Sequence, residues 1–266
     1  MKKILPFLAI LCIAITTLSS CSSENESSTV QNKLVKKIVE VNTDGTSSTY
    51  NFTYNGDKIV SINSAANSQS FTYTGNLITK ISEFNNLTQL PTTFDYTYNN
   101  ENKLIKVICS NNYELNYTYN TDGTISFEKT THDTNGNVVL VFHGVFSFVG
   151  DNMSKITKIM DDTPVTVRSE EEVSFTYDNK KNPFGAILGY SKLLDHYKNC
   201  SANNTKMSTE TATTTYLDTN QVVSSLVQHS STFQYDNNGY PTEIVSDNSV
   251  FDDQNTNHLK SLYFYE

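Results

Sequence analysis

The sequence predicts an all-β protein, an antiparallel meander of repeated hairpins that forms one strongly curved sheet or an open barrel. Two observations lead to this prediction. Aromatic residues recur at alternate positions along short segments, and clusters of Asn, Asp and Gly separate those segments. Alternation places the rings on one face of a strand and the intervening Thr, Asn and Ser on the other. The segments are rich in residues that favour strands, and the clusters in residues that favour turns.

The segments form a recurring unit. In its first clear copy Tyr50, Phe52 and Tyr54 alternate, a turn follows at 55–57, and an apolar arm carries Ile59 and Ile62. The Asn-Gly pair in the turn supplies the positive φ that a tight hairpin needs. The last aromatic positions of the first six copies are 19 to 29 residues apart, which suits hairpins with variable loops. Further copies, some of them weaker, lie at 71–81, 94–107, 113–125, 146–156, 175–179 and 233–244.

The ends of the chain each carry half a unit. Residues 34–38 read like an apolar arm, and Tyr263-Phe264-Tyr265 read like an aromatic segment. A lone hairpin cannot cover its own apolar face and is marginal in water. Successive hairpins are therefore expected to pair edge to edge and to curl over their aromatic side, with these rings in the core.

One stretch departs from the repeat. Asn182-Pro183-Phe184-Gly185 ends a strand, and apolar residues then follow at helical spacing. This spacing predicts a short helix near 186–197 that plugs or caps the sheet. The polar segment 198–215 is predicted to be a long loop, and residues 216–226 one eroded repeat arm.

The amino terminus has the pattern of an export signal. Two lysines precede an apolar run of 12 residues at 4–15, which is too short to span a bilayer as a helix. The sequence Leu18-Ser19-Ser20-Cys21 looks like a lipobox, in which the cysteine is modified with diacylglycerol and becomes the first residue after cleavage. An ordinary signal peptide and an uncleaved helix are the alternatives. The expected organisation is a signal peptide at 1–20, a flexible tether at 21–31 and a single β-hairpin-repeat domain at 32–266.

Composition argues against a nucleic-acid partner. Removing the two lysines of the leader leaves 17 basic against 28 acidic residues, a net charge of −11, and Arg168 is the single arginine. Nucleic-acid binding needs a basic footprint. An acidic chain is also repelled by anionic headgroups, so we expect the membrane to be reached through the lipid at Cys21. Cys109 and Cys200 could pair in an oxidising compartment, but two separate buried thiols are favoured.

The residues at the turns carry a resemblance. Tyr98-Asn99, Tyr119-Asn120, Tyr177-Asp178 and Tyr235-Asp236 stand at the step that is diagnostic of YD repeats in Rhs-like proteins. Over residues 32–266 the chain more closely resembles Bacteroidetes lipoproteins of the DUF4595 type, a family without an established activity. The resemblance implies a hairpin-repeat fold and no catalytic residues. The repeat decays after Gly150, and no Rhs-type protease or toxin region is attached.

Signatures of common chemistries are missing from the sequence. The five histidines include no pair at i+2 or i+4, and no Cys-x-x-Cys is present, so no zinc pattern exists. A calcium loop starting at Asp133 would need a glutamate where Gly144 stands. That segment and the one at Asp236 are better explained as hairpin turns. A nucleophile elbow, a P-loop and a dinucleotide motif are also absent. The run 170–172 of three glutamates is expected to face solvent at the start of a strand.

We therefore predict no catalytic, cofactor-binding or metal-binding residue, and Cys21 is the one predicted site. The favoured function is a non-enzymatic binding or structural module, anchored by lipid at the outer membrane, with an extracellular protein or a glycan as ligand. The acidic residues Glu24 and Glu26 favour display on the cell surface. Two alternatives stay open: a glycan-active hydrolase with carboxylates on loops such as 198–215, and a scaffold subunit of an outer-membrane complex.

Overall fold

Sixteen strands follow one another around a closed barrel, and each strand pairs antiparallel with its neighbours in the sequence. The computed structural model describes residues 32–247, 250–251 and 257–266. The predicted leader, the tether and Cys21 lie outside this part of the chain. The strands are β1 Val35–Asn42, β2 Ser47–Asn55, β3 Lys58–Asn63, β4 Asn67–Thr74, β5 Leu77–Asn85, β6 Leu90–Tyr98, β7 Leu104–Cys109, β8 Tyr113–Tyr119, β9 Ile125–His132, β10 Val138–Val149, β11 Asn152–Met160, β12 Val167–Lys181, β13 Asn203–Tyr216, β14 Gln221–Tyr235, β15 Pro241–Ser246 and β16 His258–Tyr265.

The prediction of an all-β meander is confirmed, and the sheet closes completely. β1 pairs with β16, with Val35 opposite Tyr265 and Ile38 opposite Tyr263. The two half units at the ends of the repeat region thus combine into one complete unit. Closure removes the free edges that an open sheet would expose to other chains wherever neighbouring strands are paired along their length.

A bulge explains the spacing of the apolar arms. Ile59 and Ile62 are an odd number of residues apart, yet both are buried in the barrel interior. Between β2 and β3 the register shifts by one residue, so that Tyr54 lies opposite Ile59 and Phe52 opposite Ile62. The extra residue, Val60, restores the inward direction of the following side chains. The same shift recurs between β4 and β5, β6 and β7, β10 and β11, β14 and β15, and β1 and β16.

The last tyrosine of a unit is tied to the preceding unit. The Tyr54 hydroxyl donates to the carbonyl of Val35 at 2.7 Å, and the Tyr98 hydroxyl donates to that of Ile78 at 2.8 Å. Equivalent bonds join Tyr177 to Met153 and Tyr265 to Pro241. A buried phenol must satisfy its hydroxyl, and here it does so on backbone left free by a bulge.

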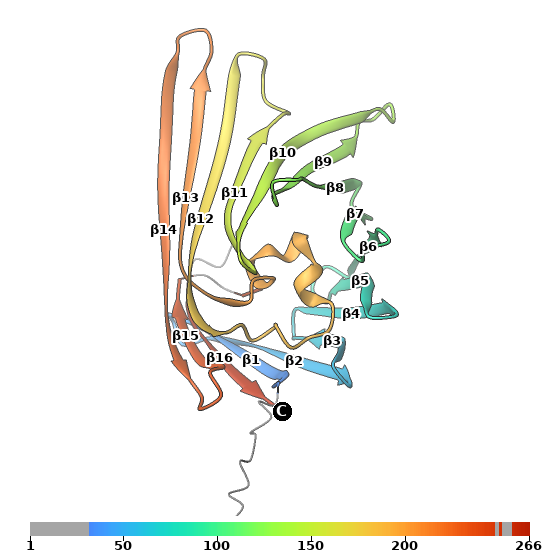
Figure 1. Ribbon diagram of the computed structural model, residues 1–266, viewed down its shortest axis with the longest axis vertical. Helices are drawn as coiled ribbons and strands as arrows, with labels where there is room; N and C mark the ends of the chain where they lie inside the picture. The colour runs from blue at the N-terminus through green and yellow to red at the C-terminus, as the bar shows by residue number, and fades with distance from the viewer. Residues whose placement is uncertain (1–31, 248–249, 252–256) are drawn as a thin grey trace, which may run out of the picture. The chain divides into compact units, whose positions relative to one another are not determined.

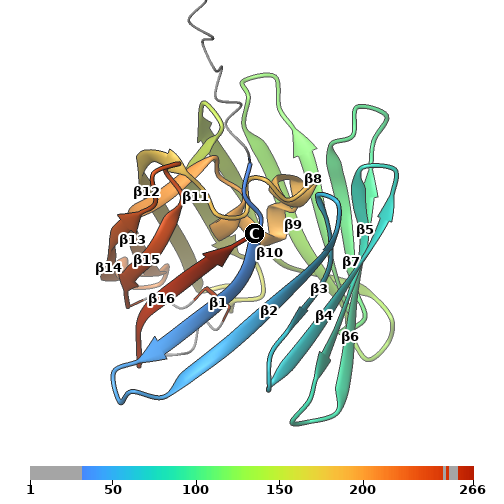
Figure 2. The same cartoon turned by 90° about the horizontal axis from the view of Figure 1, so that it is seen from below.

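The segment between β12 and β13 lies inside the ring of strands, as Figures 1 and 2 both show in orange. The predicted short helix is present only as two 3-10 segments, Tyr190–Lys192 and Leu194–Asn199. The segment, hereafter the plug (residues 182–202), is part of the core. Its buried apolar residues are Phe184, Ile187, Tyr190, Leu193 and Leu194.

Two predictions from the sequence are wrong. Residues 198–215 are not a long loop, because β13 occupies Asn203–Tyr216 and pairs with β12 and β14 along its length. The run of threonines is polar but β-branched, and such residues favour strands. Residues 216–226 complete a long hairpin rather than a separate repeat arm. Among the described residues no helix is long and apolar enough to cross a membrane.

Candidate ligand cavity in the barrel

Strands β8–β13 line a cavity of about 280 Å³ inside the barrel, on one side of the plug. Inward positions on these strands alternate with outward ones, so the aromatic rows that predicted the fold also line this space. Leu194, Asp195 and Tyr197 of the plug line the side of the cavity that faces the plug. Figure 1 shows β10–β14 rising past the shorter strands β3–β8 of the opposite wall.

The wall of the cavity is an aromatic surface. The rings of Phe127 and Phe146 are stacked with centroids 4.2 Å apart, and Phe142 meets Phe127 edge to face. Tyr117 stacks against Phe146, and Tyr197 of the plug approaches the same ring at 6.4 Å. Rings held in this way form a rigid apolar face.

Charged side chains stand among the rings. Lys129 lies over the ring of Tyr113 at 4.0 Å, and Lys158 pairs with Glu171. Glu210 also lines the cavity. The prediction that the three glutamates 170–172 face solvent at the start of a strand is therefore wrong for Glu171. Glu171 lies within β12 on the same face as Val173, whose side chain packs against the core.

A second cavity of about 290 Å³ adjoins the first through the plug, because Asp195 and Tyr197 line both. Glu83 of β5 faces this second cavity. Burial raises the pKa of Glu83 above its ordinary value, whereas the nearby His196 lowers it and the charge of Asp195 adds a smaller rise. Gln69 donates a hydrogen bond to Glu83 at 2.7 Å, which opposes this rise.

Asp195 is held by the barrel wall. Its Oδ2 accepts a hydrogen bond from the hydroxyl of Tyr96 at 2.9 Å. Burial raises the pKa of Tyr96, so the phenol stays protonated and donates. The other oxygen, Oδ1, is buried and has no hydrogen-bond partner among the described residues. A carboxyl of raised pKa and a second carboxyl therefore line one cavity.

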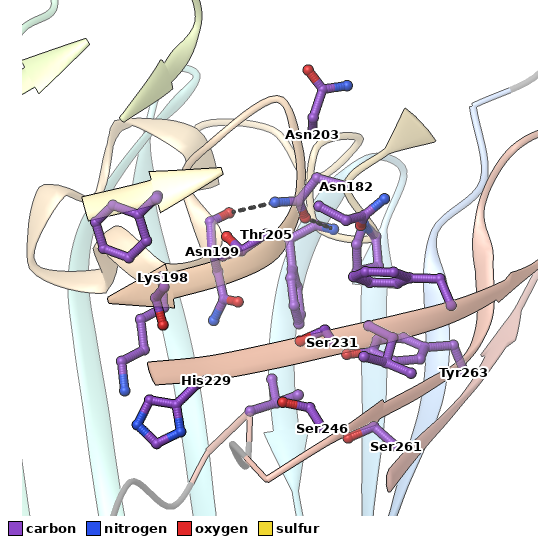
Figure 3. Close-up of a pocket in the computed structure, with 18 residues that line it drawn as sticks. Asn182, Lys198, Asn199, Asn203, Thr205, His229, Ser231, Ser246, Ser261 and Tyr263 are labelled. Atoms are coloured by element: carbon purple, nitrogen blue, oxygen red, sulfur yellow. Dashed lines mark hydrogen bonds between the residues drawn. The ribbon is translucent and has the colours of Figure 1, made fainter. Parts of the chain in front are cut away.

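A third cavity, of about 140 Å³, separates the start of the plug from β13–β16 (Figure 3). Several of its polar groups hold the chain in place. Asn182 donates to the carbonyls of Ser201 and Asn199 at 2.8 and 3.3 Å, and accepts from the amide of Phe184. His258 bonds to Ser246 and lies 3.2 Å from the hydroxyl of Ser261. These hydrogen bonds fix the start and end of the plug and the neighbouring strands in place.

The residues singled out in the sequence have structural roles. Asp133 accepts hydrogen bonds from the amides of Asn135 and Asn137 at 2.8 Å each, which closes a hairpin turn as predicted. Cys109 and Cys200 are both buried and free. The described residues bring together no group of three His, Cys, Asp or Glu side chains that could hold a metal ion.

The chain matches no protein-family profile, and no curated protein sequence matches it. Among solved structures it is similar to a porin-like protein from Bacteroides uniformis ATCC 8492, with 12% identity and a TM-score of 0.49 over 87% of this chain and 98% of that one. It is also similar to a chain in the crystal structure of TcdB2-TccC3-Cdc42, with 12% identity and a TM-score of 0.32 over 82% of this chain and 11% of that one. We draw no functional conclusion from either similarity.

Proposed function

We propose that this protein is a lipid-anchored envelope protein whose plugged barrel binds a glycan in the aromatic cavity and catalyses no reaction. The observation that carries the proposal is the cavity bounded by β8–β13 and the plug, where stacked rings alternate with charged groups. Sites for small ligands are mostly apolar and carry a few placed polar groups. The C–H face of a sugar ring packs against an aromatic face, while its hydroxyls bond to charged side chains.

The polarity of the wall supports attachment through a lipid rather than insertion of the barrel. Membrane-spanning barrels carry an apolar band outside and polar residues within. Here the aromatic rows point inward, and most of the outward residues between them are polar, although apolar side chains such as Phe264 also lie outside. Cross-strand ion pairs lie on the outside as well, such as Lys80–Asp95 and Lys155–Glu172 at 3.2 Å each. The outward residues between the aromatic positions include Asn51, Thr53, Thr72, Asp95, Thr97, Asn116, Thr118, Ser174 and Thr176.

The anchoring is tested at Cys21. In cells that process lipoproteins, Cys21→Ser is expected to abolish incorporation of labelled fatty acid and to release the protein from the membrane fraction. Retention of unlabelled Cys21→Ser in that fraction would contradict the lipid anchor. Protease added to intact cells tests surface display, because complete protection would place the protein inside the outer membrane.

Glycan binding is tested with a matched pair of aromatic substitutions. Tyr113 inside the barrel is covered by Lys129 at 4.0 Å, and Phe264 on the outer wall is covered by Lys37 at 4.1 Å. Loss of one stacking ring costs about 1.5 kcal/mol, so Tyr113→Ala should weaken binding about tenfold. Phe264→Ala should leave binding unchanged. The chain has 16 tyrosines and no tryptophan, so tyrosine emission reports titrations with soluble oligosaccharides. Equal effects of the two substitutions, or no binding across the panel, would contradict the proposal.

A second candidate is favoured by one observation. Glu83 and Asp195 line the same cavity, and the raised pKa of Glu83 suits a general acid. Paired carboxylates of this kind hydrolyse glycosidic bonds. The two functions are separated by incubating each bound oligosaccharide with wild type, Glu83→Gln and Asp195→Asn. A passive binder leaves the oligosaccharide intact in all three, whereas a hydrolase shortens it with wild type alone.

A further inference from the structure

The first ten residues of β14 lie at an open edge. β14 pairs with β13 from Gln221 to Ser230, but its pairing with β15 begins only at Ser231. On the side away from β13, no strand of the described residues pairs with residues 221–230. Figure 1 shows the hairpin of β13 and β14 extending beyond β15. Alternate amides and carbonyls along this edge are therefore open to another strand.

The edge lacks the usual protection against pairing. Natural edge strands carry lysines, prolines or bulges, or are very short. Residues 219–235 contain no Asp, Glu, Lys, Arg or Pro, in a chain whose formal net charge is −9. Four apolar side chains are exposed, two on each face, with Val222 58%, Val223 51%, Leu226 65% and Val227 49% exposed. A long, exposed, uncharged edge is a surface for strand addition.

We propose that the occupant is a second copy of this chain, paired antiparallel along the same edge and centred on Ser224. A two-fold axis normal to the sheet requires one residue of the strand to lie opposite itself. Val222 and Leu226 stand two positions on either side of Ser224, on the same face. The symmetric register therefore forms two equivalent pairs, in each of which Val222 of one subunit lies opposite Leu226 of the other. Between these pairs, the Ser224 residues of the two subunits lie opposite each other. On the other face, this register places Val223 opposite Ser225 and Gln221 opposite Val227, again without a charge.

The charge of the chain supports this choice of occupant. Two copies of an acidic protein repel each other, so a contact between them needs a strip without carboxylates. β14 provides such a strip, and in the proposed register no charged residue of 219–230 faces its counterpart. The cross-strand apolar pairs then stabilise the dimer.

The oligomeric state tests the interface. The full chain in density-matched detergent should sediment as a dimer, and Val222→Lys/Leu226→Lys should raise the dissociation constant about tenfold or more by placing lysines opposite each other. The control Val138→Lys/Val149→Lys adds the same charge at exposed valines of β10 and should remain dimeric. A wild-type monomer, or equal effects of the two lysine pairs, would overturn the proposal. A monomer with protected edge amides would assign the edge to another part of the same chain and would also overturn it.

A cross-link tests the register without relying on the lysine variants. Residues opposite each other in antiparallel strands have Cα atoms about 4.5–5.5 Å apart, within the range that a disulfide spans. After oxidation in native membranes, the Ser224→Cys variant should therefore form a disulfide-linked dimer, which a reductant separates into monomers. Thr232→Cys lies on the same strand where β15 occupies the edge, and should stay monomeric. A dimer from Thr232→Cys and none from Ser224→Cys would refute the interface.

Discussion

Replacing Gly144 by alanine is expected to destabilise the barrel strongly, although a glycine within a strand usually costs about 0.5–1 kcal/mol relative to alanine. A Cβ at this position would lie 2.1 Å from the backbone oxygen of Thr157 and 2.7 Å from Cζ of Phe127. The first distance is about 1.3 Å shorter than the 3.4 Å at which ordinary contact begins. The ring of Phe127 is held against Phe146, so it cannot swing away freely. Overpacking of this kind costs about 1–3 kcal/mol, or more where backbone must move.

Equilibrium unfolding in urea, followed by tyrosine emission and circular dichroism, measures the effect. Gly144→Ala should lower the free energy of unfolding by about 3 kcal/mol without changing the slope against urea. Ser147→Ala, on the outer face of the same strand, should change it by less than about 0.5 kcal/mol. Adding Phe127→Leu should not restore stability, because the carbonyl of Thr157 remains in the way. A Gly144→Ala variant as stable as wild type would refute the close approach of β10 and β11.

Three further predictions concern the core and its titratable groups. Leu193 of the plug is fully buried, so Leu193→Ala should cost about 2–5 kcal/mol in urea unfolding, whereas Leu87→Ala at an exposed position should cost almost nothing. Equal costs would contradict the burial of Leu193. Native Cys109 and Cys200 should resist iodoacetamide until the protein unfolds, as peptide mapping would show, because both are buried and burial raises the pKa of Cys200 to about 12. Burial also raises the pKa of Glu83, so the folded state keeps this proton at a pH where the unfolded state has lost it. Above about pH 4.5, wild type should therefore lose unfolding free energy relative to Glu83→Gln, and parallel pH profiles would contradict this.

The architecture could be predicted because its main determinant is local. Alternating rings such as Tyr50, Phe52 and Tyr54 specify one buried face of a strand, and short turns specify antiparallel neighbours. The bulges were not predicted, because Ile59 and Ile62 are three residues apart and a regular strand, with its period of two, would place them on opposite faces. The signal was nevertheless present, because the same three-residue step recurs in successive units.

The candidate cavities were harder to predict, for two reasons. Glu171 lies two residues before Val173, on the inward face of the strand, so strand alternation could have placed it inside. The run of three glutamates instead led to the prediction that it faces solvent. The position of Asp195 could not be obtained in this way. It depends on where a segment with little regular structure lies inside a closed barrel, and contacts with distant residues such as Tyr96 fix that position.

The number of strands explains why the chain needs a plug. Eight strands enclose a space that side chains can fill, whereas sixteen leave a channel that is too wide for them. An interior lined by aromatic rings would then face water at a large cost in free energy. The plug removes this cost by placing Phe184, Ile187 and Leu193 against the rings. It also divides the remaining space into separate cavities, two of which are lined by Asp195. A channel for solutes is therefore the role that this interior suits least, and retention of a ligand against the plug is the role that it suits best.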